Sequence, residues 1–288
     1  MTNTPNYGQS VKTRLLNLAK QENIRYQQMV TRYFQERFLF RLSQSKYRDH
    51  FVLKGGALLY AYDRFAARPT LDIDFMGNRI DKDVENIKAA FRFICNIQYE
   101  TDGVHFLMNT LHVVPITVEK EYPGIRASMT VTLDSIRQTM SMDIGFGDIV
   151  IPQPEELDYP VLLTDFPSTN IMAYSLETVV AEKFQTMIER TTFNSRMKDF
   201  FDIYRIRTTQ PLDETLLQEA IFATFNNRNT RYSENHILFS EKFSQNSDLN
   251  QRWNAYLKKI HYEPKIPFAD VMEQIQKWLE PYWDKLKE

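Results

Sequence analysis

The sequence contains a single cysteine, Cys95, among its 288 residues, so no disulfide can form within the chain. Glycine is also scarce, at 8 residues, which leaves few positions for tight turns and favours a helix-rich fold. No apolar run approaches the roughly 20 residues needed to cross a bilayer, and the polar first ten residues contain no signal-peptide core. These absences predict a cytoplasmic protein with no membrane partner.

Net charge is small as well. The chain has 35 basic and 37 acidic residues, a formal charge of −2, so the whole molecule is not a general binder of polyanions. The charge is uneven, however, because residues 1–50 hold nine basic and only three acidic side chains. Such a segment can form a local nucleic-acid-binding surface. A solvated helix face is the alternative explanation.

The stretch 51–77, FVLKGGALLYAYDRFAARPTLDIDFMG, carries the most specific pattern. In a strand over its last part, Asp72 and Asp74 share one face, while Leu71, Ile73 and Phe75 share the other and can be buried. Two carboxylates on one face repel each other unless a cation lies between them, and carboxylate oxygens suit Mg²⁺. This pattern predicts a metal site; an exposed strand edge is the alternative.

Gly55 and Gly56 follow a short apolar run and precede a helical pattern. Glycines there let backbone N–H groups approach a phosphate, and a helix N-terminus favours an anion. The alternative is a tight turn. A further carboxylate, Asp143, lies in the strand-like segment 139–149, in which Met140 and Met142 alternate with polar or small residues. Beside the two aspartates it would complete a cluster of three carboxylates.

The second half carries charged residues within apolar helical patterns. Lys183 lies in Ala181-Glu182-Lys183-Phe184, and Asp199 and Asp202 are three residues apart on one face of a later helix. A lysine could neutralise phosphate charge during phosphoryl transfer, with an aspartate orienting it or acting as a base. Ordinary ion pairing is the alternative.

Periodicity predicts an α/β (α+β) protein. The expected domains are residues 1–165, with N-terminal helices and a small mixed β-sheet, and residues 166–288, a helical domain that contributes a lysine and an aspartate to the cleft. The segment 152–167, with four prolines, is the expected boundary. The predicted helices cover 11–20, 26–43, 57–62, 82–96, 175–189, 197–207, 212–225, 248–259 and 268–285, and the predicted strands 51–53, 71–75, 104–108, 111–119, 127–133 and 139–149.

Three segments together resemble a known family: FVLKGGALLYAY, RPTLDIDF and AEKFQTMIERTTFNSRMKDFFDIYRI. They are similar to the AbiEii/MenT nucleotidyltransferase toxins of the DNA polymerase β-like nucleotidyltransferase superfamily. The resemblance covers about residues 11–210. The family's first motif, a Gly-rich turn followed by Asp-x-Asp, matches Gly55, Gly56, Asp72 and Asp74. Three further residues lie in family-like positions as nucleotide contacts: Lys54, Arg68 and Thr70.

The remaining motifs of the family match less directly. The second motif is an acid on a central strand, which we assign to Asp143. The third is a Ser or Thr followed on the same helix by a lysine, here Lys183, although Ser175 is one residue farther from it than the family pattern requires. The fourth is an aspartate in the next helix. Asp199 fits it best, and Asp202 is the competing residue and a candidate nucleotide contact.

The resemblance implies transfer of a nucleotide from an NTP, with Mg²⁺ as cofactor. Asp72 and Asp74 would hold the metal with Asp143, the backbone of the two glycines would hold the triphosphate, and Lys183 would contact phosphate with support from Asp199. The family consists of toxins of type IV toxin–antitoxin modules, which implies an antitoxin partner.

Some members add nucleotides to the 3′ end of tRNA, so RNA is the implied acceptor. Arg32, Arg37 and Arg41 of the basic segment would then contact its backbone. Two alternatives remain open from the sequence: nucleotidylation of a protein or small molecule, and an NTP-binding protein without turnover.

Overall fold

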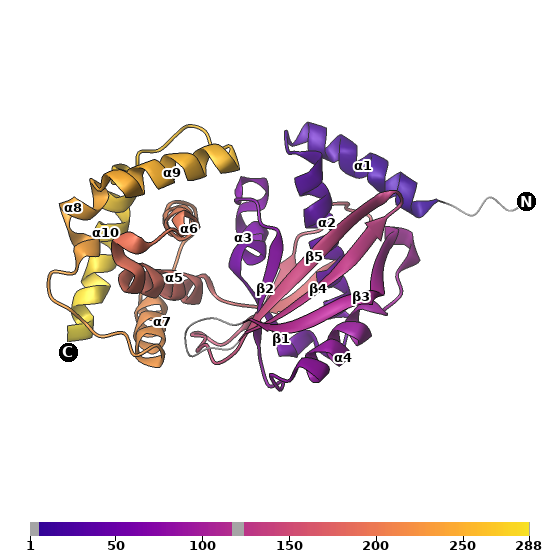
Figure 1. Cartoon of the computed structure of the whole chain (residues 1–288), viewed down its shortest axis with the longest axis horizontal. Helices are drawn as coiled ribbons and strands as arrows, with labels where there is room; N and C mark the ends of the chain where they lie inside the picture. Colours follow the sequence, from indigo (N-terminus) through magenta and orange to yellow (C-terminus); the bar gives the residue numbers. More distant parts are fainter. Residues whose placement is uncertain (1–5, 117–123, 288) are drawn as a thin grey trace, which may run out of the picture. The chain divides into compact units, whose positions relative to one another are not determined.

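The computed structural model describes residues 6–116 and 124–287 (Figure 1). These residues form two compact units. The first comprises the described residues of 1–147 and 155–173, and the second those of 148–154 and 174–288. The chain thus enters the second unit briefly, returns to the first for one strand pair, and then completes the second.

The first unit combines helices and strands. Its elements in chain order are α1 (Tyr7–Gln21), α2 (Tyr26–Ser43), β1 (Phe51–Lys54), α3 (Gly55–Asp63), β2 (Asp72–Gly77), α4 (Val84–Cys95), β3 (Val104–Ile116), β4 (Gly124–Leu133), β5 (Ile136–Gly145), β6 (Glu155–Tyr159) and β7 (Thr169–Ala173).

The strands of the first unit form one seven-stranded sheet in the order β3-β4-β5-β2-β1-β7-β6. Strands β2 and β5 pair in parallel, as do β1 and β7, and the other neighbours are antiparallel. The sheet is therefore mixed, and the predicted α/β class with flanking helices is confirmed. The carboxylate-bearing strands β2 and β5 are neighbours at its centre.

Helices α2 and α4 cover one face of the sheet through an aromatic core. The ring of Phe38 on α2 lies 5.5 Å from that of Phe91 on α4 and 6.2 Å from that of Phe75 on β2. Phe51 on β1 contacts both Phe75 and Phe91. Because side chains alternate along a strand, burial of Phe75 on this face directs Asp72 and Asp74 to the other face.

The second unit is helical beyond residue 174. Its helices are α5 (Leu176–Arg190), α6 (Met197–Thr209), α7 (Glu214–Asn227), α8 (Glu241–Ser244), α9 (Ser247–Ile260) and α10 (Phe268–Asp284). Aromatic rings form its core, and Trp283 of α10 packs against Phe184 of α5 and Phe225 of α7. The second half is thus helical, as its pattern predicts.

Several predicted strands differ from those observed. The segments 104–108 and 111–119 form one strand, β3, with a register shift between Leu107 and His112; residues 117–119 lie outside the described part of the chain. Strands β6 and β7 were not predicted. The proline-rich segment 152–167 contains β6, which completes one edge of the sheet. Within the described residues, every helix is too short or too polar to cross a bilayer.

Candidate functional site

The two aspartates of β2 lie side by side on the face that the aromatic core leaves uncovered. Asp72 and Asp74 are half-buried, whereas Ile73 and Phe75 between and after them are fully buried. The predicted alternation therefore holds within the strand. It fails at Leu71, which was expected to be buried and is 70% exposed, because β2 begins only at Asp72.

The strand register places four charged residues in one row across the sheet. Lys54 on β1 lies opposite Asp74 on β2, Asp74 lies beside Asp143 on β5, and Asp143 lies opposite Arg126 on β4. Residues that pair across strands point to the same face. The row thus runs from cation to two anions to cation over four neighbouring strands.

Gly55, the first residue of α3, makes room for one of these carboxylates. It has a φ of +69°, and a Cβ added there would lie 2.1 Å from Oδ2 of Asp74. No other residue adopts this backbone conformation without strain while leaving space for the carboxylate. The sequence order of glycine before Asp-x-Asp therefore corresponds to direct contact in space.

Gly56 lies against the segment that leads into β2. A Cβ there would lie 2.9 Å from Cβ of Thr70 and 3.0 Å from Nη1 of Arg68. Thr70 in turn donates from Oγ1 to the carbonyl oxygen of Asp72 at 3.2 Å. The structure therefore brings Arg68 and Thr70 to the start of α3, beside the carboxylates.

The start of α3 has the properties of an anion site. The N-cap residue is Lys54, whose ammonium can only donate hydrogen bonds and so cannot cap the first amides of the helix. The N-terminal end of a helix dipole also favours negative charge. A phosphate group and a carboxylate-bound cation would suit this part of the first unit.

Asp143 has a partner that the sequence reading missed. Arg126 donates from Nε and Nη2 to the two oxygens of Asp143, at 2.7 and 2.6 Å. These hydrogen bonds and the charge of Asp143 raise the pKa of Arg126, to which Asp72 and Asp74 also contribute. The guanidinium thus faces all three acids. A polar residue between buried Ile125 and Ala127 on a strand was the signal available in the sequence.

The neutralised third carboxylate limits what the site can bind. Across residues 6–116 and 124–287, no group of three or more His, Cys, Asp or Glu side chains is arranged to hold a metal ion. Magnesium is commonly bound by one or two carboxylates together with substrate phosphates and water. Asp72 and Asp74 fit that mode, and both oxygens of Asp143 accept hydrogen bonds from Arg126.

The second unit contains the predicted lysine and both competing aspartates in one cluster. Nζ of Lys183 on α5 lies 2.9 Å from Oδ1 of Asp199 and 2.7 Å from Oδ2 of Asp202, both on α6. Arg196 completes it, with Nε 2.6 Å from Oδ2 of Asp199. Both aspartates are buried. Asp199 and Asp202, the two alternatives from the sequence, thus contact the same ammonium.

The charges of this cluster are balanced. Burial alone would raise the pKa of Asp199, but the positive charges of Lys183 and Arg196 outweigh it and hold that pKa well below its usual value. Asp199 is therefore ionised near neutral pH. Ser175, the residue considered for the third motif, is the N-cap of α5 and accepts a hydrogen bond from the amide of Thr178 at 3.2 Å.

The prediction of a basic surface on the N-terminal segment is wrong for three of its arginines. Arg32, Arg37 and Arg41 of α2 are 8%, 0% and 2% exposed, so none of them can contact RNA from the surface. Arg41 pairs with Asp102 at 2.8 Å. Ring faces surround the guanidinium of Arg37, including that of Phe40 at 4.6 Å. All three lie inside the first unit, because α2 is buried on every side along most of its length.

Comparison with known proteins identifies the family. A family model described as nucleotidyl transferase AbiEii toxin, type IV TA system, matches residues 37–283. No curated protein matches the chain. Two solved structures from Helicobacter pylori are similar in outline.

The first of these structures is JHP933, which is 13% identical, with 91% of this chain and 97% of that chain covered and a TM-score of 0.46. The second is a putative nucleotidyltransferase, 14% identical, with 90% and 98% covered and a TM-score of 0.45. The family match spans most of the chain, and the protein belongs to the AbiEii family of nucleotidyltransferase toxins of type IV toxin–antitoxin systems.

Proposed function

We propose that this nucleotidyltransferase carries out a magnesium-dependent transfer of a nucleotide from an NTP to an RNA acceptor, namely the 3′ end of a tRNA. The observation that carries the proposal is the contact between the Gly55 turn and Asp74. It brings an anion-binding helix start and a pair of carboxylates together, as a metal-bound triphosphate requires.

In this proposal the first unit binds the nucleotide. Asp72 and Asp74 hold the magnesium ion, and the amides of Gly55 and Gly56 receive phosphate oxygens. A bound magnesium ion supplies charge stabilisation to the attacking and leaving oxygens during the transfer. Asp143 would be a further ligand for the metal in place of its pairing with Arg126.

Further side chains of the first unit orient the same triphosphate. Lys54 and Arg68 lie at the start of α3, where their positive charge attracts phosphate, and Thr70 fixes the backbone that leads into β2. Arg126 is a fourth cationic or polar group next to the carboxylates. Binding by fixed groups of this kind lowers the barrier by positioning the reactants before reaction.

The second unit contributes a lysine to the transfer. We assign Lys183 to contact phosphate, while Asp199 and Asp202 hold its ammonium in one orientation. The two carboxylates balance the positive charges of Lys183 and Arg196. Asp199 and Asp202 are then positioning residues for the lysine.

Acceptor and partner complete the proposal. An RNA acceptor and a cognate antitoxin would meet this enzyme in the cytoplasm. The alternative acceptor is a protein side chain or a small molecule. Because the arginines of α2 are buried, they provide no support for the RNA acceptor, which must be recognised elsewhere.

The test is incubation of the purified protein with each labelled NTP, Mg²⁺ and total RNA. We expect label in RNA that RNase removes. Label that resists RNase but is lost with protease would assign a protein acceptor. Asp72→Asn should reduce the rate by about a hundred-fold or more, because metal-ion charge stabilisation is worth several kcal/mol. Chelation of divalent metal should have the same effect.

Asp81→Asn is the matched control, because Asp81 is an exposed aspartate of the same unit that lies outside β2. Its rate should equal that of the unchanged protein. Equal rates for Asp72→Asn and Asp81→Asn would overturn the assignment of Asp72 as a metal ligand.

A further inference from the structure

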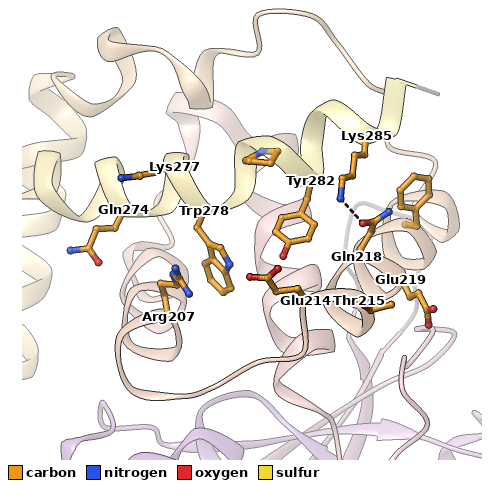
Figure 2. Close-up of a pocket in the computed structure, with 12 residues that line it drawn as sticks. Arg207, Glu214, Thr215, Gln218, Glu219, Gln274, Lys277, Trp278, Tyr282 and Lys285 are labelled. Atoms are coloured by element: carbon orange, nitrogen blue, oxygen red, sulfur yellow. Dashed lines mark hydrogen bonds between the residues drawn. The ribbon is translucent and has the colours of Figure 1, made fainter.

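The second unit contains a groove that the proposed reaction does not use. It lies between α7 and α10, beside the C-terminal end of α6, and has a volume of about 960 Å³ (Figure 2). Its lining combines aromatic, cationic and amide side chains, all of them from the second unit. A volume of this size lies within the usual range of ligand pockets.

Two cations lie over aromatic rings along this groove. The guanidinium of Arg207 is 5.2 Å from the ring centroid of Trp278, and Nζ of Lys285 is 5.6 Å from that of Tyr282. Lys285 also donates to Oε1 of Gln218 at 2.7 Å, as the dashed line in Figure 2 shows. Aromatic rings and positively charged side chains therefore already lie next to each other along the groove. Proteins that bind single-stranded nucleic acid combine these two features, stacking surfaces and cations.

The charges of the groove give a further indication of its ligand. The lining contains three basic residues, Arg207, Lys277 and Lys285, against two acidic ones, Glu214 and Glu219. Burial, and the charge of Glu214, raise the pKa of Tyr282, while Arg207 lowers it, so all three side chains share one region. Figure 2 shows the carboxylate of Glu214 next to Tyr282 and near Trp278.

A carboxylate between aromatic rings suits a nucleobase better than an acidic peptide. Glu214 would repel the carboxylates of such a peptide. It would repel RNA phosphates as well, but it can accept a hydrogen bond from the exocyclic amine of a base such as cytosine, which an acidic side chain does not offer. Pro281, within α10, also lines the groove. Because proline has no N–H, it cannot donate to the carbonyl oxygen of Lys277 four residues earlier.

We propose that this groove binds a single-stranded segment of RNA, with a base stacked at Trp278 and phosphates contacted by Lys277, Lys285 and Arg207. The inference rests on the proposed function in one respect, that the acceptor is RNA. It gives the enzyme an RNA-binding surface in place of the buried arginines of α2.

The test measures binding of the full chain to a labelled single-stranded RNA of about twelve nucleotides by fluorescence anisotropy, without NTP or divalent metal. Trp278→Ala should weaken binding about ten-fold, because base stacking on an aromatic ring contributes that much or more. Lys277→Glu, an exposed change that spares the core, should also weaken binding. Lys277→Ala should reduce the slope of log affinity against log salt by about 0.7, the value for one phosphate contact on a single strand.

Two matched controls lie in the same unit outside the groove. Phe193→Ala removes an exposed aromatic ring, and Lys265→Glu makes the same charge change on an exposed lysine. Both should bind RNA as the unchanged protein does. Circular dichroism of each variant checks that the fold is intact.

The outcomes separate this proposal from the proposed function. Failure of the unchanged protein to bind RNA, or equal binding by the groove variants and the controls, would overturn the groove assignment. If transfer to RNA occurs while the groove variants bind RNA normally, the assignment of the groove as an RNA site is wrong and the enzymatic proposal stands. If the groove variants lose RNA binding but no NTP is transferred to RNA, the groove stands and the acceptor assignment falls.

Discussion

Arg126 and Asp143 form a two-hydrogen-bond ion pair across β4 and β5, with both carboxylate oxygens engaged at 2.6 to 2.7 Å. The arginine side chain is 47% exposed and the aspartate 25%. An ion pair with this much exposure contributes about 1 kcal/mol or less. Asp143 can therefore exchange Arg126 for a cation at little free-energy cost.

The first prediction concerns this exchange. Arg126→Gln should raise the affinity for Mg²⁺ in the absence of NTP by about two- to ten-fold, because it releases one carboxylate and removes a positive charge that faces two others. Isothermal titration calorimetry measures the change. Arg137→Gln, an exposed arginine on β5, the strand that carries Asp143, is the control. Unchanged or weaker Mg²⁺ binding by Arg126→Gln would show that the arginine does not compete with the cation.

The second prediction concerns the turn before α3. Gly55→Ala should destabilise the protein by about 1–3 kcal/mol because alanine is strained at positive φ, and its Cβ would displace the carboxylate of Asp74. Transfer activity of the folded fraction should fall as well. Urea denaturation and the labelled-NTP assay measure the two effects.

Gly103→Ala is a close control for that change. Gly103 has a φ of +66°, and a Cβ there would lie 2.6 Å from Cα of Gly8, in the same unit. It should lose a similar amount of stability and keep its activity per folded molecule. If both variants lose activity to the same extent, the displacement of Asp74 is not the reason.

The third prediction concerns the buried cluster of the second unit. Lys183→Met should destabilise the protein by about 3–5 kcal/mol near neutral pH, since it removes the ammonium that Asp199 and Asp202 share. The pKa of Asp199 is lowered in the folded state, so its stabilising contribution is present above the unfolded pKa of about 3.9 and is lost as pH falls below it.

Denaturation at several pH values tests this dependence. The difference in free energy of unfolding between the unchanged protein and Lys183→Met should be largest near neutral pH and should shrink below about pH 4. Lys258→Met, an exposed lysine on α9, should show no such difference. If the difference in free energy of unfolding does not depend on pH, Lys183 acts through packing alone.

The fourth prediction concerns Glu36 in the core of the first unit. Burial raises the pKa of Glu36 to about 7, against the lowering effects of Arg37 and of the hydrogen bond from the Leu162 amide. The folded state therefore binds this proton more tightly than the unfolded state. The resulting stabilisation is complete below about pH 4 and is lost as pH rises through 7.

Glu36→Gln should remove that loss. Relative to the unchanged protein, the variant should gain stability between about pH 5 and 8, by on the order of 3 kcal/mol. Glu100→Gln, at an exposed position of the same unit, should leave the pH dependence unchanged. Parallel stability profiles for Glu36→Gln and the unchanged protein would contradict the raised pKa.

Local patterns predicted much of this structure. The bounds of α2 follow from its sequence, and the alternation in β2 and β5 placed Asp72, Asp74 and Asp143 on strands that prove to be neighbours. What local pattern cannot give is the partner that a polar side chain meets from a distant element. Arg41 was read as a surface residue, yet its partner Asp102 lies 61 residues away and buries it.

The site shows the same limit. Arg126 is one arginine in an ordinary strand pattern, and its importance appears only when the register places it opposite Asp143. Strand β7, Thr169–Ala173, was missed because five residues after a proline-rich segment give too short a pattern. Leu71 was assigned to the core because the start of a strand is hard to locate to within one residue.

The burial of α2 has a practical consequence for anyone who trims this protein. The family match begins at residue 37, in the middle of that helix, and ends at Trp283, inside α10. Cutting there would delete Met29, Tyr33 and Phe34, which are 0–1% exposed, and with them the first part of the helix that covers the sheet. The limits of the shared sequence pattern are therefore not the limits of a fragment that can fold, and truncation for crystallisation should start no later than α1.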